Sequence, residues 1–244
     1  MIKCLLNLCL LLLLPIVLSC GGSNGDNTAQ IDGFFYSFDE SGGTIIDYSG
    51  NNYHGDPQAL SRVTGKVGGA IRFISPGSNI ELTRLYNYCP FMAGFTFRAW
   101  IKIEQPITTR QQIIGGWTVG ETHYPINNFG ISLIDDRLSF EVAAYPSAIS
   151  VTTDQLNFPI DQWFHVAITY DMDQIKCYYN GTLVATDSIL TTFKNEFLNQ
   201  IGHNYRSWSG ITILDQFFGY LDELYLEETV MSDAEILDYY NSTN

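Results

Sequence analysis

The acidic stretch Leu221–Glu228 is the first place in this chain to look for catalytic carboxylates. A glycosidase needs two carboxyl groups flanking the scissile bond, one acting as an acid and the other as a nucleophile or base. Alternation along a β-strand would give the stretch two faces, with Glu223, Tyr225 and Glu227 on one and Asp222, Leu224 and Leu226 on the other. Some glycosidases place a Glu-x-Asp-x-x-Glu-like set of carboxylates on one face of a strand, and here Tyr225 replaces the middle carboxylate of that set, so we predict no catalytic residue in this stretch.

Other signatures of enzyme chemistry are missing from the sequence. The four histidines, His54, His123, His165 and His203, are scattered, and no pair has the spacing of metal ligands. A Gly-x-Ser-x-Gly sequence occurs once, at Gly21–Gly25, in the polar glycine-rich segment after Cys20 and not at the strand-to-helix turn that the hydrolase motif requires, and there is no phosphate-binding loop. We therefore predict a binding protein without catalytic residues, and an unrecognised glycan-active enzyme is the alternative that remains open.

Four aromatic residues in polar stretches could form a binding platform: Trp117, Tyr124, Tyr205 and Trp208. Carbohydrate sites combine flat aromatic rings with amide and carboxylate hydrogen-bonding groups, and Trp208 lies in a polar segment, residues 203–210, that has both. The alternative is that these rings close the edge of the fold, because aromatic residues are common at protein surfaces.

The first residues have the composition of a targeting peptide. Lys3 precedes the apolar run 5–18, whose fourteen residues suit a signal peptide and are too few for a membrane-spanning helix, which needs about 20. The following Val17-Leu18-Ser19-Cys20 resembles the bacterial lipobox. That resemblance implies removal of residues 1–19, a lipid-anchored Cys20 and a flexible linker over residues 20–31.

Length and charge limit the classes of partner. Removal of residues 1–19 leaves 244 − 19 = 225 residues, which fits one β-sandwich domain over residues 32–244. The remaining formal charge is 11 − 26 = −15, because Lys3 is lost and all acidic residues stay. Such a chain is repelled by nucleic acid and by anionic lipid headgroups, so we expect membrane contact only through the lipid anchor.

Two further cysteines follow Cys20 in the mature chain, Cys89 and Cys177. Cys177 lies in an alternating apolar segment, which favours a buried thiol. A disulfide between Cys89 and Cys177 is the alternative that an exported protein permits.

The body of the chain has the pattern of an all-β protein. Residues 95–103 alternate, with Phe95 and Phe97 on one face and Arg98 and Trp100 on the other, which predicts a half-buried strand. Turn signals at Asp135–Arg137, Asp171–Asp173 and Asn180–Gly181 separate further apolar runs. Ser232–Glu235 forms a capping box ahead of Ile236, which predicts a short C-terminal helix.

Several segments, in this order, resemble the laminin G-like, concanavalin A-like jelly roll. They are Phe38–Gly42, Asp47–Gly55, Gly65–Phe73, Phe95–Ile101, Trp163–Asp171, Phe218–Leu224 and Met231–Ile236. The resemblance covers about residues 32–240 and implies one jelly-roll sandwich with a short C-terminal helix. One fold hosts many functions, so the ligand does not follow from it.

The resemblance also implies a structural calcium ion and gives two tryptophans a role. Asp39 and Asp222 are the implied calcium ligands, with Asp47 and Asn51 in support, since calcium binds oxygen atoms of carboxylates and amides. Their alternative role is to form turns through side chain to backbone hydrogen bonds. Trp100 and Trp163 fall at positions that the family fills with tryptophan, so both are interpreted as packing residues.

Together these observations predict a non-catalytic envelope lipoprotein that binds a ligand through a laminin G-like domain. A glycan is the expected ligand. A surface protein, bound in adhesion or assembly, is the alternative. No aspartate stands directly after Cys20, which by the same lipobox resemblance favours anchoring in the outer membrane.

Overall fold

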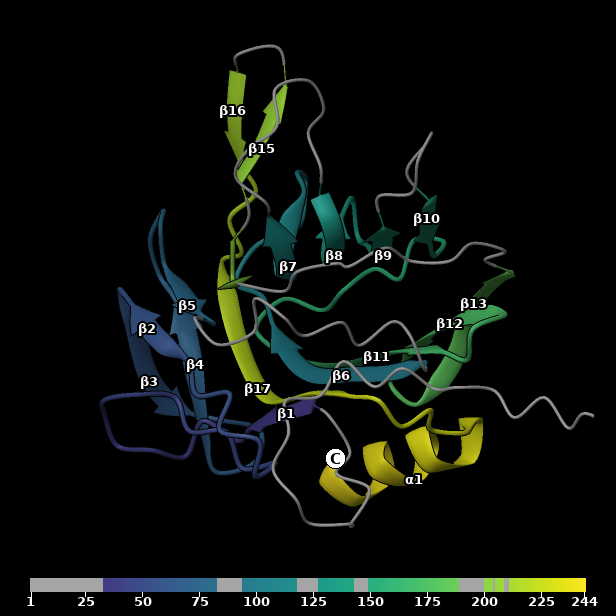
Figure 1. Cartoon of the computed structure of the whole chain (residues 1–244), viewed down its shortest axis with the longest axis horizontal. Helices are drawn as coiled ribbons and strands as arrows, with labels where there is room; N and C mark the ends of the chain where they lie inside the picture. The colour runs from purple at the N-terminus through teal and green to yellow at the C-terminus, as the bar shows by residue number, and fades with distance from the viewer. Residues whose placement is uncertain are drawn as a thin grey trace, which may run out of the picture.

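The computed structural model describes residues 33–82, 94–117, 127–142, 149–188, 200–203, 205–208 and 211–244. Two antiparallel sheets face each other as the layers of a sandwich (Figure 1). The eight-stranded sheet contains β13 (Thr182–Ser188), β12 (Gln174–Tyr179), β11 (Trp163–Tyr170), β6 (Phe95–Lys102), β17 (Gly219–Glu227), β4 (Gly69–Phe73) and β3 (Leu60–Thr64) in spatial order, and β1 (Gly33–Tyr36) pairs with β17.

The seven-stranded sheet lies opposite. Its spatial order is β10 (Ile149–Thr152), β9 (Arg137–Val142), β8 (Asn127–Ile134), β7 (Gln111–Trp117), β14 (Gln200–Ile201), β5 (Asn79–Glu81) and β2 (Asp56–Gln58). A separate hairpin of β15 (Tyr205–Trp208) and β16 (Ile211–Leu214) stands beyond β7, on the side away from the C-terminal helix α1 (Asp233–Thr243) (Figure 1).

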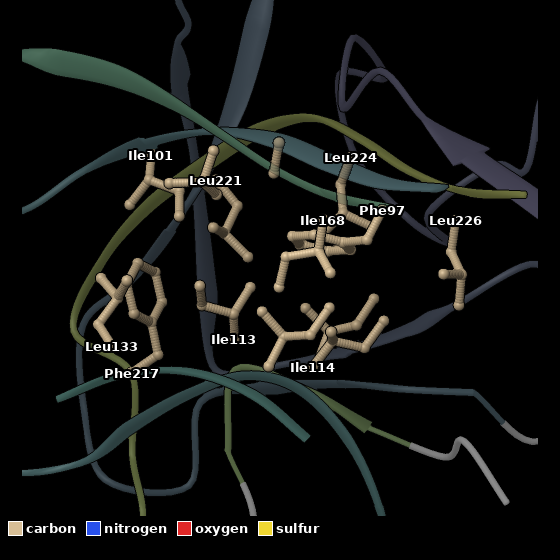
Figure 2. Packing of buried hydrophobic residues seen from close by; sticks show 14 of the residues in the cluster. Phe97, Ile101, Ile113, Ile114, Leu133, Ile168, Phe217, Leu221, Leu224 and Leu226 are labelled. Atoms are coloured by element: carbon tan, nitrogen blue, oxygen red, sulfur yellow. The ribbon is translucent and has the colours of Figure 1, made fainter. Parts of the chain in front are cut away.

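One hydrophobic core fills the space between the sheets. Figure 2 shows Phe97, Ile101 and Leu221 extending from the eight-stranded sheet toward Ile113 and Leu133 of the other. All five side chains are inaccessible to solvent. The alternation of apolar and polar residues therefore produces the predicted jelly-roll sandwich, because each strand buries one face against the opposite layer.

The predicted turns connect the predicted strands. Asp135 and Asp136, between β8 and β9, have φ values of 55° and 57°, and Asn180 and Gly181, between β12 and β13, have 49° and 75°. Two consecutive positive φ values are typical of the tight hairpin turns that match strand twist. Asn and Asp tolerate this region better than other residues with a side chain, which is why these dipeptides predicted the turns.

The prediction that β6 is half-buried was wrong. Thr96, Arg98 and Trp100 point away from the core, yet they are 0%, 7% and 1% exposed. Helix α1 packs on this outer face, where the Trp100 indole lies 5.6 Å from the Tyr240 ring and donates a hydrogen bond to Thr243 Oγ1. Strand periodicity identifies the core-facing side but carries no information about a helix that covers the other side.

The predicted division of faces along β17 was wrong at Asp222. The register of β17 against β6 shifts between Asp222 and Tyr225, and Glu223 adopts a φ of +48°. This β-bulge adds one residue, so Leu221 and Leu224 both reach the core although they are three apart. Asp222 instead pairs with Trp100 and lies on the helix-covered face.

The capping box of α1 forms as predicted. Ser232 Oγ accepts from the Glu235 backbone N–H, and the Glu235 carboxylate accepts from the Ser232 backbone N–H. Ile236 is the buried residue of the helix and packs against Ala167 and Tyr178 of the sheet. In the parts of the chain that the structure describes, none of the helical segments is long and apolar enough to cross a membrane.

Candidate binding site

The outer face of the seven-stranded sheet carries two rows of small or polar residues that cross four strands. Direct pairing places them opposite one another, and we call the two rows the polar face. Its rows are Gln112–Ser132–Ser139–Thr152 and Gly115–Gly130–Glu141–Ser150. The intervening residues of β8 and β9, such as Ile131 and Phe140, belong to the core, so alternation alone directs these polar groups outward.

An ion pair stands over the polar face. Arg110 Nη2 lies 2.5 Å from Glu141 Oε1, and Arg110 Nη1 donates to Ser132 Oγ at 2.7 Å. The side chains of Arg110 and Glu141 are 12% and 22% exposed, so part of each remains accessible. A guanidinium has five N–H groups and these bonds use two of them, which leaves donors for a ligand.

Two glycines make room for a buried amide under this ion pair. Gln112 is 1% exposed, and its Nε2 donates to the carbonyl oxygens of Ile114 at 2.6 Å and Ile131 at 3.0 Å. A Cβ atom at Gly130 would stand 2.7 Å from that nitrogen, and one at Gly115 would stand 3.1 Å from it. The floor of the polar face is therefore fixed before any ligand arrives.

A cavity of about 360 Å³ opens beside the polar face and shares Arg110 with it. Its volume lies within the usual range of small-ligand sites. The lining is Gln105, Pro106, Thr108, Thr109, Arg110, Gln111, Leu214, Gln216 and Phe218. Amide, hydroxyl and guanidinium groups beside a phenyl ring and an isobutyl group can bind a polyhydroxylated molecule that also has apolar C–H surface.

Two glutamines hold the rim of this cavity in place. Gln111 Oε1 accepts from the Phe218 backbone N–H at 2.9 Å. Gln216 Oε1 accepts from the Gly77 N–H at 2.7 Å, and its Nε2 donates toward the carbonyl oxygens of Ser78 and Gly202. These contacts join segments that are far apart in sequence, so the cavity is a product of the complete sandwich.

The structure describes the backbone of three of the four residues in the predicted aromatic platform. Tyr205 and Trp208 lie on β15, and Tyr205 pairs with Leu214, which lines the cavity. Trp117 ends β7, at the opposite end of that strand from Gln111. Tyr124 lies outside the described residues. The structure thus brings the β15 backbone to the cavity, and the role of the four aromatic rings stays a prediction.

The two principal calcium candidates, Asp39 and Asp222, both contact the turn between β3 and β4, where backbone N–H groups donate to their carboxylate oxygens. Asp39 Oδ1 accepts from Gly69 N–H at 2.7 Å, and Asp222 Oδ2 accepts from Lys66 and Val67 N–H at 2.7 and 2.9 Å. Burial raises the pKa of Asp222 to about 7. Both carboxylates therefore hold the loop between β3 and β4.

The supporting calcium candidates are likewise engaged in turns. Asp47 accepts hydrogen bonds from the N–H groups of Phe35, Ser49 and Tyr53 and from the Ser49 hydroxyl, while Asn51 Nδ2 donates to Gly33 O. Within the described ranges, no group of three His, Cys, Asp or Glu side chains could hold a metal ion. Calcium binding stays a prediction. The hydrogen bonds of the four candidates are those of the alternative role, in which their side chains bind backbone groups of turns.

Of the cysteines, Cys177 is a free, fully buried thiol whose burial raises its pKa to about 12. Cys20 and Cys89 lie outside the described residues, as does the linker before β1.

A family model described as the concanavalin A-like lectin/glucanases superfamily matches residues 75–237, which is more than half of the chain. The chain belongs to this superfamily. The match includes the polar face, the cavity and all of β17. No curated protein matches the chain.

Solved structures share this concanavalin A-like fold at low identity. The binding domain of Paraclostridial Mosquitocidal Protein 1 has a TM-score of 0.65 and 18% identity, with 86% of this chain and 51% of that chain covered. Domain 4 of AbnA, a GH43 extracellular arabinanase from Geobacillus stearothermophilus, in complex with arabinotriose, has a TM-score of 0.63 and 20% identity, with 86% and 98% covered.

A third similar structure is the binding domain of botulinum neurotoxin DC in complex with rat synaptotagmin II, with a TM-score of 0.57 and 15% identity, covering 86% of this chain and 51% of that one. This chain therefore spans about half of the toxin domains and nearly all of the arabinanase domain. At these identities the likeness establishes the fold, and the ligand must be argued from the side chains of this chain.

Sequence reasoning missed Arg110, Gln112 and Glu141. Alternation along β8 and β9 does direct Ser132 and Glu141 to the outer face, so half of the signal was present in the sequence. The pairing of Arg110 with Glu141, thirty-one positions away, depends on the register of three strands and has no local signature.

Proposed function

We propose that this concanavalin A-like domain is a non-catalytic glycan-binding module, carried by an exported lipoprotein that Cys20 anchors in the outer membrane. The observation that carries the proposal is the Arg110–Glu141 pair, which stands over a floor of hydroxyl and amide groups beside a cavity. Sugar hydroxyls both donate and accept hydrogen bonds. A fixed, mutually neutralised guanidinium–carboxylate pair offers donors and acceptors together without selecting for a charged ligand.

The same geometry argues against hydrolysis at the polar face. Glu141 Oε1 accepts a hydrogen bond from Arg110 Nη2. A glycosidase also needs a second carboxyl group across the bond, and the described members of the two rows contain only Glu141. Binding without bond cleavage is therefore the activity that the described residues support.

The structural comparison is compatible with this proposal. Domain 4 of the arabinanase was solved with arabinotriose, and this chain covers nearly all of it. A short neutral oligosaccharide of that kind could use hydroxyl-directed contacts at the polar face.

Protein recognition is the second candidate, and it has an observation of its own. Strand β13 ends the eight-stranded sheet, and most of its residues are exposed, Leu183 by 41%. An edge strand offers unpaired backbone groups to an extended peptide, which would add to the sheet as a further strand. A pull-down in which substitution at β13 abolished enrichment of a partner would favour this candidate.

The glycan proposal is tested by calorimetric titration of the full chain with arabinotriose and with a panel of neutral oligosaccharides. Arg110→Ala should lower the affinity of the bound oligosaccharide at least about tenfold, since each tenfold corresponds to about 1.4 kcal/mol. The matched control is Arg62→Ala, which removes a similarly buried Arg–Glu pair, with Glu40, at β3 and should leave affinity unchanged. Absence of binding, equal loss in both variants or release of reducing sugar would contradict the proposal.

A further inference from the structure

A second surface with ligand-binding chemistry lies on the outer face of the other sheet. Four residues face one another across the neighbouring strands β4, β17, β6 and β11: Arg72, Tyr220, Lys102 and Trp163. Cations alternate with aromatic rings along this row, which we call the cation–aromatic ladder. Neighbouring strands are about 4.8 Å apart, so the ladder spans about 14 Å, the length of a short oligosaccharide.

The members of the ladder contact one another. Lys102 Nζ lies 3.9 Å from the centre of the Tyr220 ring and 5.2 Å from that of Trp163. The guanidinium carbon of Arg72 lies 5.4 Å from the centre of the Tyr220 ring. The centres of the Tyr220 and Trp163 rings are 6.1 Å apart, and the planes of these two rings make an angle of 68°. Cation–π contacts of this kind hold long basic side chains in one orientation and reduce the entropy lost on binding.

One positive charge of the ladder has no paired carboxylate. Glu104 pairs with Arg72 at 2.7 Å and also accepts from the Tyr220 hydroxyl at 2.8 Å. For Lys102, the described residues supply no carboxylate within ion-pair distance. Exposed Asp161 acts on Tyr220 only through a weak charge interaction. Lys102 is thus a localised cation without a direct ion-pair partner among the described residues, although its charge contributes to lowering the pKa of Glu104, and it lies on a chain of net charge −14.

Helix α1 covers the part of the sheet face next to the ladder but leaves the ladder partly exposed. The adjoining position of β6 is Trp100, which is 1% exposed beneath the Tyr240 ring of α1. Lys102, two residues further along β6, and Trp163 and Tyr220 beside it are only partly buried. The helix therefore leaves this end of the face available to a partner.

We propose that the cation–aromatic ladder binds an acidic glycan, that is, a sugar chain bearing carboxylate groups. Sugar C–H surface would pack on the rims of Trp163 and Tyr220, and a carboxylate would pair with Lys102 and the accessible edge of Arg72. The row crosses paired strands in the middle of a sheet, so a peptide could not add there as a strand. The proposal is independent of the polar face, since the two surfaces belong to different sheets.

The ladder is tested by titrating the full chain with oligogalacturonate, in parallel with arabinotriose. We expect Lys102→Gln and Trp163→Ala each to weaken oligogalacturonate binding about tenfold, while Lys102→Arg retains most of it. The control variant is Lys176→Gln, which removes a cation of the same sheet that is paired with Asp233, and it should not change affinity. Added salt should weaken the complex, because the interaction is between exposed charges.

The outcomes separate the ladder from the polar face. Arg110→Ala should leave oligogalacturonate binding unchanged, and Lys102→Gln should leave arabinotriose binding unchanged. The ladder proposal is overturned if the wild-type chain does not bind oligogalacturonate, if Lys102→Gln binds it as well as the wild type, or if oligoglutamate of equal charge binds equally well. Circular dichroism of each variant shows that the fold is retained, and Lys102→Arg provides the conservative comparison.

Discussion

The outer faces of the two sheets differ in what covers them, and their composition follows from this. On the seven-stranded sheet the outward residues are glycine, serine, threonine, glutamine and a glutamate paired with Arg110. On the eight-stranded sheet, Arg98 and Trp100 are large, and helix α1 buries them. Arg98 stacks between Tyr225 and Tyr239, at 3.3 and 3.8 Å from their ring centres. The face that α1 covers therefore carries bulky contacts, whereas on the other face Gln112, Ser132 and Ser139 are buried and Arg110 and Glu141 are partly exposed.

The comparison also explains the position of the ladder. It occupies the end of the covered sheet that α1 does not reach, so its aromatic and basic residues remain partly exposed. Tryptophan illustrates the difference. Trp100 is buried under the helix, whereas Trp163 lies beyond the helix and is partly exposed.

The largest expected effect distinguishes the two tryptophans. Trp100→Ala should lower the free energy of unfolding by about 3–5 kcal/mol, because it leaves a cavity under α1. Trp163→Ala should lower it by less than about 1.5 kcal/mol, since the side chain is only partly buried. Urea denaturation of both variants measures the difference, and equal losses would show that the helix does not create a core on this side.

The free energy of unfolding should depend on pH through His165, which is buried on the sheet face that α1 covers. Burial, and secondly the charge of Arg98, lower the pKa of His165 from 6.5 to about 3. Between these values the unfolded chain binds a proton that the folded chain does not, so His165 destabilises the fold by about 1.4 kcal/mol for each unit by which the pH falls from 6.5 toward 3. Asp222, whose pKa burial raises to about 7, acts in the opposite direction below pH 7.

Substitution isolates the histidine contribution. His165→Gln should show a smaller loss of unfolding free energy than the wild type between pH 6.5 and 4, measured by urea denaturation at each pH. The two pH profiles would run parallel if His165 were protonated in the folded protein, which would contradict its burial under α1.

On the polar face, Gly130→Ala should lower the free energy of unfolding by about 1–2 kcal/mol, because its Cβ would stand 2.7 Å from Gln112 Nε2. The double variant Gly130→Ala with Gln112→Ala should lose less than the sum of the two single variants, since the clash is then gone. Additive losses in denaturation would mean that the amide does not lie against this glycine.

The smallest expected effect concerns the N-terminus of the covering helix. Ser232→Ala removes the acceptor of the Glu235 backbone N–H and should cost about 1 kcal/mol. It should leave arabinotriose binding unchanged, because the polar face lies on the other sheet. Thermal denaturation measures the first and calorimetry the second, and weakened binding would show that the two faces are coupled.

Features that arise from neighbouring residues were predictable. The paired positive φ values at Asn180–Gly181 and the capping box at Ser232 and Glu235 follow from interactions over a few positions. The division of β8 and β9 into core and outer residues follows from strict alternation. The bulge at Glu223 was missed because it depends on how β17 pairs with β6, which is decided by burying Leu221 and Leu224 together.

The sequence alone determined the class of fold, its turns and its C-terminal helix, because period-two alternation, turn dipeptides and helix caps are local physical preferences. Only the tertiary structure decided that α1 covers Arg98 and Trp100, that Arg110 meets Glu141, and that Lys102 lies between two rings on an open surface. Those contacts join strands separated by tens of residues, and their formation depends on register, a bulge and a docked helix, which no short segment encodes by itself.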